Sequence, residues 1–159
     1  MINLYYINSD KMKIAIVSGK DEGPTKLNAF DNALLKAKIG NVNLIKVSSM
    51  LEKNTEVVDL PKLKAGSMVN CVLSEITSSK KGDKISSSIA IAIGENLGCV
   101  VENSGVNKDS DDIINESIAM VKYMMEVRSE KILELIVKEE SHVVENIASV
   151  ITAVVYLED

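Results

Sequence analysis

Hydrophobic and polar positions change in short blocks along the chain, and this pattern predicts a mixed fold of strands and two helices. Short apolar or alternating runs that end at glycine or at polar turns predict strands at residues 13–17, 42–47, 67–77, 85–93, 98–101 and 147–156. Between them we expect a loop over 19–26, a turn over 78–83 and a mostly irregular segment over 50–65 with a possible strand at 56–60.

Two stretches have the spacing of amphipathic helices. Residues 27–37 repeat apolar side chains every three or four positions, and Gly40 follows as a stop signal. Residues 109–128 begin with acidic side chains, which suit the positive end of a helix dipole. The apolar stripe of this second helix is Ile114, Ile118, Val121 and Met125.

The order of these elements suggests a duplicated architecture. Strand, helix, strand, strand runs from residue 13 to 77, and a similar order runs from 98 to 156 if residues 132–144 form a strand. Residues 132–137 alone are ambiguous between helix and strand. Two β-α-β-β units would each make a sheet covered by one helix, with the sheets face to face. We therefore expect an α+β fold, an α/β/β/α four-layer sandwich, in one domain spanning residues 1–159.

The composition of the chain argues against nucleic acids and membranes as binding partners. The chain has 159 residues, a net charge of −5, 3% aromatic residues and no tryptophan, so neither a cationic surface nor stacking platforms for nucleic acid are expected. No apolar run is long enough to span a bilayer, so we expect no membrane partner. The opening residues, MINLYYINSDKMK, lack the order of a signal peptide, and a cytoplasmic protein is the expectation.

Cysteine and histidine suggest no separate chemistry. Cys71 and Cys99 lie inside apolar segments and are expected to be small core residues; a zinc site would need a tighter ligand cluster. His142 is the single histidine, and no nucleophile elbow accompanies it. Arg128 falls in the last turn of the second helix, where a cation is favourable. We assign no mechanistic role to His142 or Arg128.

Serine pairs are common in this chain and carry little information alone. Ser78-Ser79 and the run 86–88 are of the same kind as Ser48-Ser49. The pair at 48–49 differs because it follows a predicted strand directly and opens the irregular segment. Backbone strain of the kind needed for self-cleavage is plausible at such a junction.

The context of Ser48-Ser49 also carries a resemblance. The stretch LNAFDNALLKAKIGNVNLIKVSS at residues 27–49 resembles the signature region of archaeal-type pyruvoyl-dependent arginine decarboxylases. The similarity continues through LPKLKAGSMV at 60–69 and ISSSIAIAI at 85–93. It is weaker but collinear through the strand ending at Glu102 and through SHVVEN at 141–146, so nearly the whole chain is included.

The resemblance implies self-cleavage between Ser48 and Ser49. The Ser49 hydroxyl would attack the Ser48 carbonyl, and elimination would leave chains 1–48 and 49–159, the longer one starting with a pyruvoyl group. This covalent group would form a Schiff base with the α-amine of arginine and accept electrons as carbon dioxide leaves, giving agmatine. The family implies no metal and no pyridoxal phosphate.

Three further residues match the family's functional positions. Glu102 matches the acid that returns a proton to the α-carbon, and its place at the end of an apolar strand suggests partial desolvation. Asn43 matches the amide that stabilises the oxyanion during cleavage. Asp31 matches a carboxylate near the substrate guanidinium, for which a fixed carboxylate is well suited.

The family also implies homo-trimers with active sites between subunits. This chain departs from the family pattern because no proline follows Ser49 in the segment from Met50 to Asn54. The departure motivates a second hypothesis, a non-cleaving, non-catalytic paralogue that serves as a binding or regulatory subunit. A third reading is an unrelated α/β module whose similarity is accidental.

Overall fold

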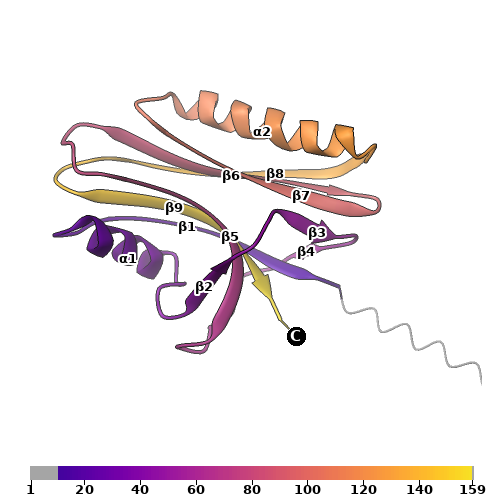
Figure 1. The fold of residues 1–159 in the computed structure, drawn as a ribbon, viewed down its shortest axis with the longest axis horizontal. Helices are drawn as coiled ribbons and strands as arrows, with labels where there is room; N and C mark the ends of the chain where they lie inside the picture. The colour runs from indigo at the N-terminus through magenta and orange to yellow at the C-terminus, as the bar shows by residue number, and fades with distance from the viewer. Residues whose placement is uncertain (1–10, 159) are drawn as a thin grey trace, which may run out of the picture.

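The computed structural model describes residues 11–158, in which two helices and nine strands form four stacked layers (Figure 1). Helix α1 covers the outer face of one sheet and helix α2 covers the outer face of the other. The expected α/β/β/α sandwich is therefore confirmed. Most of the opening segment on which the signal-peptide expectation rests lies outside the described residues.

The first sheet has five strands and the second has four. The first has the order β2-β5-β9-β1-β4. Its elements are β1 (Lys13–Glu22), α1 (Lys26–Lys36), β2 (Asn43–Lys46), β4 (Glu56–Val57), β5 (Met68–Ser78) and β9 (Ala148–Leu157). The second sheet has the order β3-β7-β6-β8. Its elements are β3 (Met50–Glu52), β6 (Lys84–Gly94), β7 (Leu97–Val106), α2 (Ser110–Val127) and β8 (Ile132–Val143).

The last strand corrects the expected division into two self-contained units. Strand β9 does not join the second sheet: it lies at the centre of the first, antiparallel to both β1 and β5. Residues 148–155 of β9 are all buried, so both of its faces need cover. Strand β8 instead lies at one edge of the second sheet, and several of its side chains are exposed.

Four apolar clusters of buried residues lie in the described part of the chain, and three of them lie between the layers. The intersheet cluster includes Ile14, Leu51, Val72, Ile91 and Val100. A second cluster fills the space between α1 and the first sheet, and a third fills the space between α2 and the second sheet. The alternation of isoleucine with serine and alanine in β6 follows this division: the isoleucines face the other sheet, and Ala90 and Ala92 lie under α2.

Gly19 was expected to end a short strand and open a loop, but β1 continues to Glu22. The prediction failed because glycine has a packing role at this position. A Cβ atom at Gly19 would lie 2.1 Å from the backbone oxygen of Ala33 in α1. The missing side chain thus lets the helix lie close on the strand, and it does not mark a turn.

Two other segments become strands. Residues 132–137, ambiguous in the sequence, begin the twelve-residue strand β8. The segment 50–65, expected to be mostly irregular, contains β3 and β4, and β4 lies within the possible strand at 56–60.

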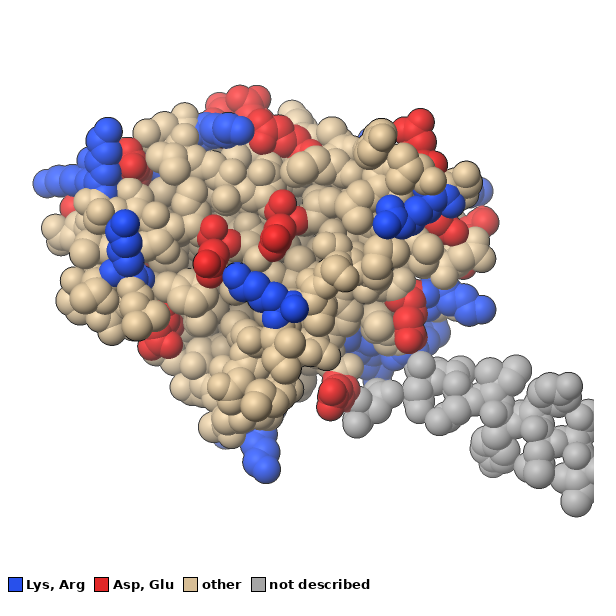
Figure 2. Space-filling model, in the orientation of Figure 1, with Lys and Arg blue, Asp and Glu red and all other residues tan. Residues whose placement is uncertain are grey.

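On the face drawn in Figure 2, acidic and basic side chains lie interspersed. Within the described part of the chain, no helix has the length and apolar character needed to cross a membrane.

A polar clamp joins the end of β1 to the turn between β8 and β9. The Glu22 carboxylate lies 2.7 Å from His142 Nε2 and accepts hydrogen bonds from the backbone N–H groups of Glu145 and Asn146. Burial raises the pKa of Glu22, but these hydrogen bonds and the neighbouring imidazole outweigh it and lower the pKa overall. His142, for which the sequence suggested no role, thus has a structural partner.

The lowered pKa of Glu22 predicts a pH-dependent contribution to stability. A carboxyl group whose pKa is lower in the folded state stabilises the fold above its unfolded pKa of about 4.3, and this stabilisation is lost as the pH falls through the folded value. Glu22→Gln should therefore lower the Tm at pH 7, and the difference from wild type should shrink below about pH 4. Thermal unfolding of both proteins from pH 7 to pH 3 tests this. A constant difference across the range would contradict it.

Candidate functional site

The site is built around a short crossing between the two sheets. Strand β2 lies at an edge of the first sheet and β3 at an edge of the second, and only residues 47–49 connect them. The Val47 N–H donates to Cys71 O at 3.0 Å in the first sheet, and Val100 N–H donates to Ser49 O at 2.8 Å in the second. The Ser48–Ser49 peptide bond is therefore fixed at both ends by different sheets.

Apolar anchors support the crossing on both sides. Val47 and Leu51 pack against the intersheet cluster, and Leu51 is only 3% exposed. Within the crossing, Met50 N–H donates to Ser48 O at 3.0 Å, which closes a three-residue turn centred on Ser49. Ser48 is exposed and Ser49 is partly buried. The serine pair singled out in the sequence thus occupies a constrained turn.

A cavity of about 580 Å³ opens beside this turn. Ser49 lines it together with residues 100–102 of β7. Helix α2 contributes the remaining wall through Ala119, Met120, Tyr123 and Met124. The cavity brings together Ser49 and Glu102, two of the predicted site residues, and most of its wall is apolar.

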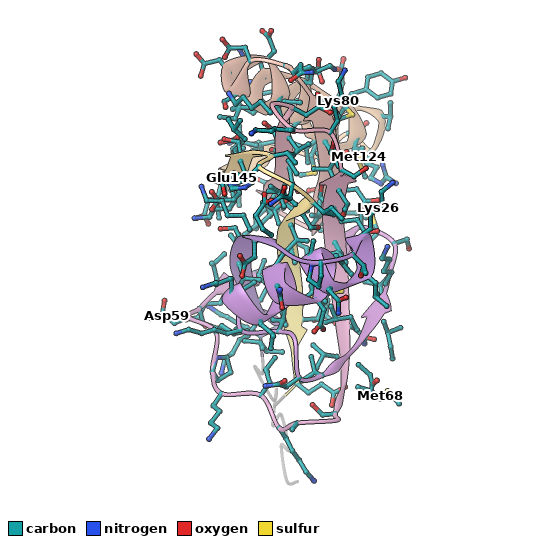
Figure 3. All side chains as sticks on the ribbon, turned by 90° about the vertical axis from the view of Figure 1, so that its left-hand side faces the viewer. Lys26, Asp59, Met68, Lys80, Met124 and Glu145 are labelled. Carbon is teal, nitrogen blue, oxygen red and sulfur yellow. The ribbon has the colours of Figure 1, made fainter. Side chains whose placement is uncertain are left out.

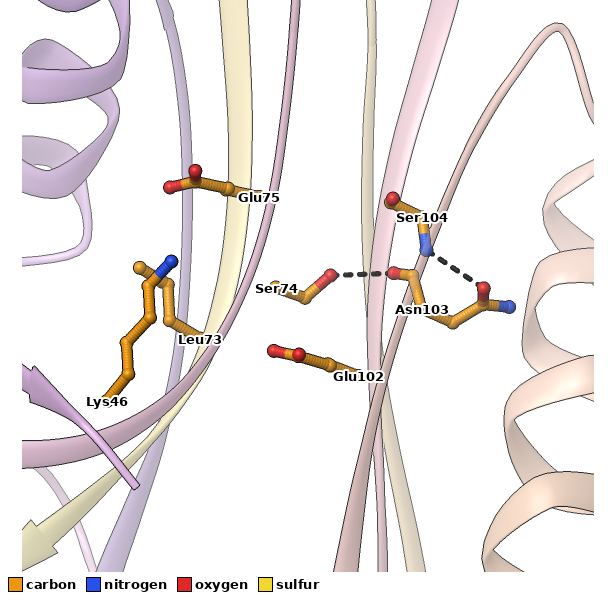
Figure 4. Close-up of a pocket in the computed structure, with 7 residues that line it drawn as sticks. All are labelled: Lys46, Leu73, Ser74, Glu75, Glu102, Asn103 and Ser104. Atoms are coloured by element: carbon orange, nitrogen blue, oxygen red, sulfur yellow. Dashed lines mark hydrogen bonds between the residues drawn. The ribbon is translucent and has the colours of Figure 1, made fainter. Parts of the chain in front are cut away.

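Glu102 also borders a second cavity of about 330 Å³ at the edge of β5. In Figure 4 its carboxylate points from β7 toward β5, near Ser74, and Lys46 and Glu75 extend from the other side of β5. Glu102 therefore lies where an apolar and a charged cavity meet. Its side chain is exposed in the single chain, so this chain alone does not supply the desolvation expected from the sequence.

Asn43 is not brought to Ser49 within one chain. It starts β2, where its side-chain amide donates to Gly66 O at 3.0 Å and its N–H donates to Ser67 O. Its partner in the sheet register is Met68. In the side view of Figure 3, Met68 lies in the lower part of the molecule, whereas Met124, which lines the cavity, lies in the upper half.

Asp31 is likewise separate from Ser49 in the single chain. It is an exposed residue of α1, the helix that covers the outer face of the first sheet, whereas the cavity lies against α2 on the other side of the sandwich (Figure 1). Asp31 lines neither of the two cavities that Glu102 borders. The predicted site residues therefore form two groups, one at the crossing and one on other surfaces.

The remaining candidates have structural positions. Cys71 and Cys99 are buried and free, as expected, and burial raises the pKa of Cys71 to about 11. Arg128 caps α2, and its guanidinium donates to Met124 O at 3.0 Å. Within residues 11–158, no group of three or more His, Cys, Asp or Glu side chains could hold a metal ion.

Two tyrosines next to the site were missed from the sequence. Tyr123 lines the cavity and is 65% exposed, and the exposed Met120 and Val127 lie on the same side of α2. These exposed apolar residues form a face of α2 that is separate from its buried residues. That pattern in the sequence could have identified Tyr123. Tyr156 donates from its hydroxyl to Met50 O at 2.9 Å. No local pattern links residues 106 positions apart, so that contact needed the structure.

Comparisons with known proteins match the chain to a family. The pyruvoyl-dependent arginine decarboxylase family matches residues 13–159. A protein of that name from Methanothermobacter thermautotrophicus is 60% identical over 147 residues, which are 92% of this chain and 97% of the relative. Another from Pyrococcus furiosus is 40% identical over 152 residues, 90% of this chain and 93% of the relative. A third, from Methanocaldococcus jannaschii, is 40% identical over 120 residues, 72% of this chain and 71% of the relative.

A covalent pyruvoyl group formed at Ser49 would fit this site, because the preceding carbonyl is held in a turn and Ser49 lines the cavity beside it. On the sequence matches, the chain belongs to the pyruvoyl-dependent arginine decarboxylase family.

Proposed function

We propose that this chain cleaves itself between Ser48 and Ser49 and then decarboxylates arginine to agmatine and carbon dioxide. One observation carries the proposal beyond family membership: Ser49 and Glu102, distant in sequence, line the same cavity. The single domain of residues 1–159 would become a shorter chain, 1–48, and a longer chain, 49–159, with the pyruvoyl group at position 49.

The cleavage uses only atoms of the chain and one water. Ser49 Oγ bonds to the Ser48 carbonyl carbon, the C–N bond between the two residues breaks, and the hydroxyl proton ends on the nitrogen. Loss of the Cα proton of residue 49 then breaks its Cβ–O bond and leaves Ser48 as a carboxylate. The resulting dehydroalanine takes up water and releases ammonia. The two anchors of the crossing support this step because they hold the reacting atoms together.

The two products are expected to stay assembled. Residues 1–48 include β1, which pairs with the central strand β9 along its whole length, and β2, which pairs with β5. The new end at residue 49 keeps its hydrogen bond from Val100. Cleavage therefore removes one covalent bond at the edge of the sandwich and leaves the sheets and their cores in place.

The decarboxylation itself divides between the new group and the surrounding residues. The carbonyl of a pyruvoyl group supplies a sink for the electrons released as carbon dioxide leaves. Glu102, beside Ser49, is positioned to return a proton to the α-carbon. Met120, Met124 and Tyr123 offer an apolar wall for the methylene chain of arginine and limit the entry of water.

The remaining site residues require a second subunit. Asp31 would bind the guanidinium and Asn43 would stabilise the oxyanion of cleavage, but neither reaches Ser49 in one chain. We propose a homo-oligomer, a trimer with active sites between subunits, in which a neighbour supplies them. The open cavity, the exposed Glu102 and the exposed apolar face of α2 support this arrangement. A cytoplasmic location stays a prediction from the sequence.

Self-cleavage predicts two fragments under denaturing conditions. Mass spectrometry of the purified protein should find chains 1–48 and 49–159, the second with a blocked N-terminus and the mass of a pyruvoyl group in place of serine. Ser49→Ala should leave one intact chain because the nucleophile is gone. Ser79→Ala, in the other serine pair, should cleave as wild type does. An intact wild-type chain after long incubation would instead favour the non-catalytic paralogue.

The role of Glu102 predicts a defect in turnover and not in processing. Glu102→Gln keeps the size of the side chain but removes the acid, and should lower kcat for arginine by roughly 100-fold or more. Carbon dioxide release is measured per mole of cleaved chain, so that any loss of the pyruvoyl group is corrected for. Glu75→Gln, at the charged cavity, is the matched control. Equal kcat values for Glu102→Gln and wild type would exclude Glu102 as the proton donor.

The role of Asp31 predicts a change in substrate affinity. Asp31→Asn should raise KM for arginine by roughly 10- to 100-fold, because a charged hydrogen bond to the guanidinium is lost. The exposed Asp59→Asn serves as control. Release of labelled carbon dioxide from arginine, lysine, ornithine and aspartate should favour arginine in wild type. Release from aspartate but not arginine would refute the assignment of Asp31.

A further inference from the structure

The turn at the cleavage site uses a backbone donor that the sheet leaves free. In the antiparallel β3–β7 pair, Val100 N–H donates to Ser49 O, and hydrogen-bonded positions alternate along such a ladder. Met50, paired with Cys99, is therefore at a non-bonded position, and its N–H and C=O point away from β7. That N–H donates to Ser48 O at 3.0 Å instead.

The carbonyl of Met50 has its own partner in the other sheet. Tyr156 of β9 donates its hydroxyl to Met50 O at 2.9 Å. Tyr156 is partly buried, and burial raises the pKa of its phenol, so the hydroxyl keeps its proton near neutral pH and stays a donor. Both polar backbone groups of Met50 are thus occupied, one by the carbonyl before the cleavage site and one by a tyrosine from the opposite sheet.

This arrangement matters for the first step of cleavage. When Ser49 Oγ bonds to the Ser48 carbonyl carbon, negative charge develops on Ser48 O before the C–N bond breaks. A donor already aimed at that oxygen stabilises the charge without reorganisation. The Met50 N–H stays directed at this oxygen only if the backbone at Met50 is fixed. The Tyr156 side chain, from the opposite sheet, fixes it through the hydrogen bond to Met50 O.

We propose that the Met50 N–H is an oxyanion donor for self-cleavage and that Tyr156 is the positioning residue that keeps it in place. The proposal rests on the proposed cleavage between Ser48 and Ser49. It adds a donor from the same chain to the Asn43 amide, which in a single chain is bound to Gly66 O. If Tyr156 served only to link β9 to β3, its replacement would affect stability but not the rate of the acyl shift.

Tyr156→Phe tests the proposal because it removes only the hydroxyl. The full-length precursor is made by cell-free translation with a brief radioactive label, synthesis is stopped, and conversion to chains 1–48 and 49–159 is followed on denaturing gels. Tyr156→Phe should cleave about tenfold more slowly or worse, since small displacements of reacting groups cost this much. Thr77→Val, which removes a hydroxyl bond to Ser149 elsewhere in the same sheet, should stay within about twofold of wild type.

Hydroxylamine separates the acyl shift from the later elimination. It attacks the ester carbonyl of Ser48, forms a hydroxamate there and frees the Ser49 hydroxyl, so cleavage in excess hydroxylamine reports ester formation alone. Tyr156→Phe should be slowed by the same factor in hydroxylamine as without it. If hydroxylamine restores the wild-type rate, the tyrosine acts on elimination and the proposal is overturned. Cleavage of Tyr156→Phe at the wild-type rate overturns it as well.

Two further measurements distinguish a folding defect from a slower acyl shift. In the Ser49→Ala background, which cannot start the acyl shift, Tyr156→Phe should change the Tm no more than Thr77→Val does. A semisynthetic chain with Met50 replaced by its α-hydroxy acid keeps the side chain and removes only the N–H, and it should cleave roughly 100-fold more slowly. A normal rate in that chain overturns the proposal. A wild-type chain that never cleaves overturns both this proposal and the proposed function.

Discussion

The crossing of residues 47–49 between the two sheets is the constraint on which the rest of the site depends. Two sheets packed face to face are about 10 Å apart, and three residues reach at most roughly that far, so the crossing has little slack. Hydrogen bonds from Val47 to Cys71 and from Val100 to Ser49 fix its two ends. The intersheet cluster, with Leu51 on one side of the turn, sets the separation. The packing of the two sheets therefore determines the geometry of the Ser48–Ser49 peptide bond.

The four proposed site residues fall into two groups in the single chain. The crossing lies at an edge of each sheet, and Ser49 and Glu102 line a cavity beside it. Asp31 lies on α1, on the other side of the sandwich, and Asn43 bonds to Gly66 at the start of β2. In the proposed assembly of identical chains, a neighbour would supply these last two groups.

Much of the fold could be predicted because the apolar pattern reports it directly. The isoleucine alternation of β6 appears in the sequence, and its two kinds of position face the other sheet and α2. The stripe expected for α2 is only partly right, because Ile113 and Ser117 are buried with Val121 and Met125, whereas Ile114 and Ile118 are only partly buried. The predictions for Gly19 and for β9 were wrong for the same reason. A local sequence pattern does not show which element packs against a residue. Gly19 looks like a stop signal until α1 is placed on it, and β9 looks like the partner of β8 until its complete burial requires a central position.

The site could be predicted only in part. Ser49 and Glu102 came from the resemblance, and the structure places them together. Tyr156 and the N–H of Met50, which β7 leaves unpaired, could not be found from sequence, because their relation arises from strand register and a contact between sheets. No proline follows Ser49, yet the chain is ordered there, because residues 50–52 form a strand paired with β7. Pairing with a neighbouring strand supplies the order that proline would otherwise supply.

Carbon-13 NMR directly observes the ketone carbon into which the proposed self-cleavage converts Cα of Ser49. Protein made with serine labelled at Cα is purified and its spectrum is recorded without any substrate. We expect one labelled resonance in the ketone region, carried by the chain 49–159, and the loss of that resonance in Ser49→Ala. A wild-type spectrum in which every serine Cα stays in the ordinary aliphatic region would contradict pyruvoyl formation at Ser49.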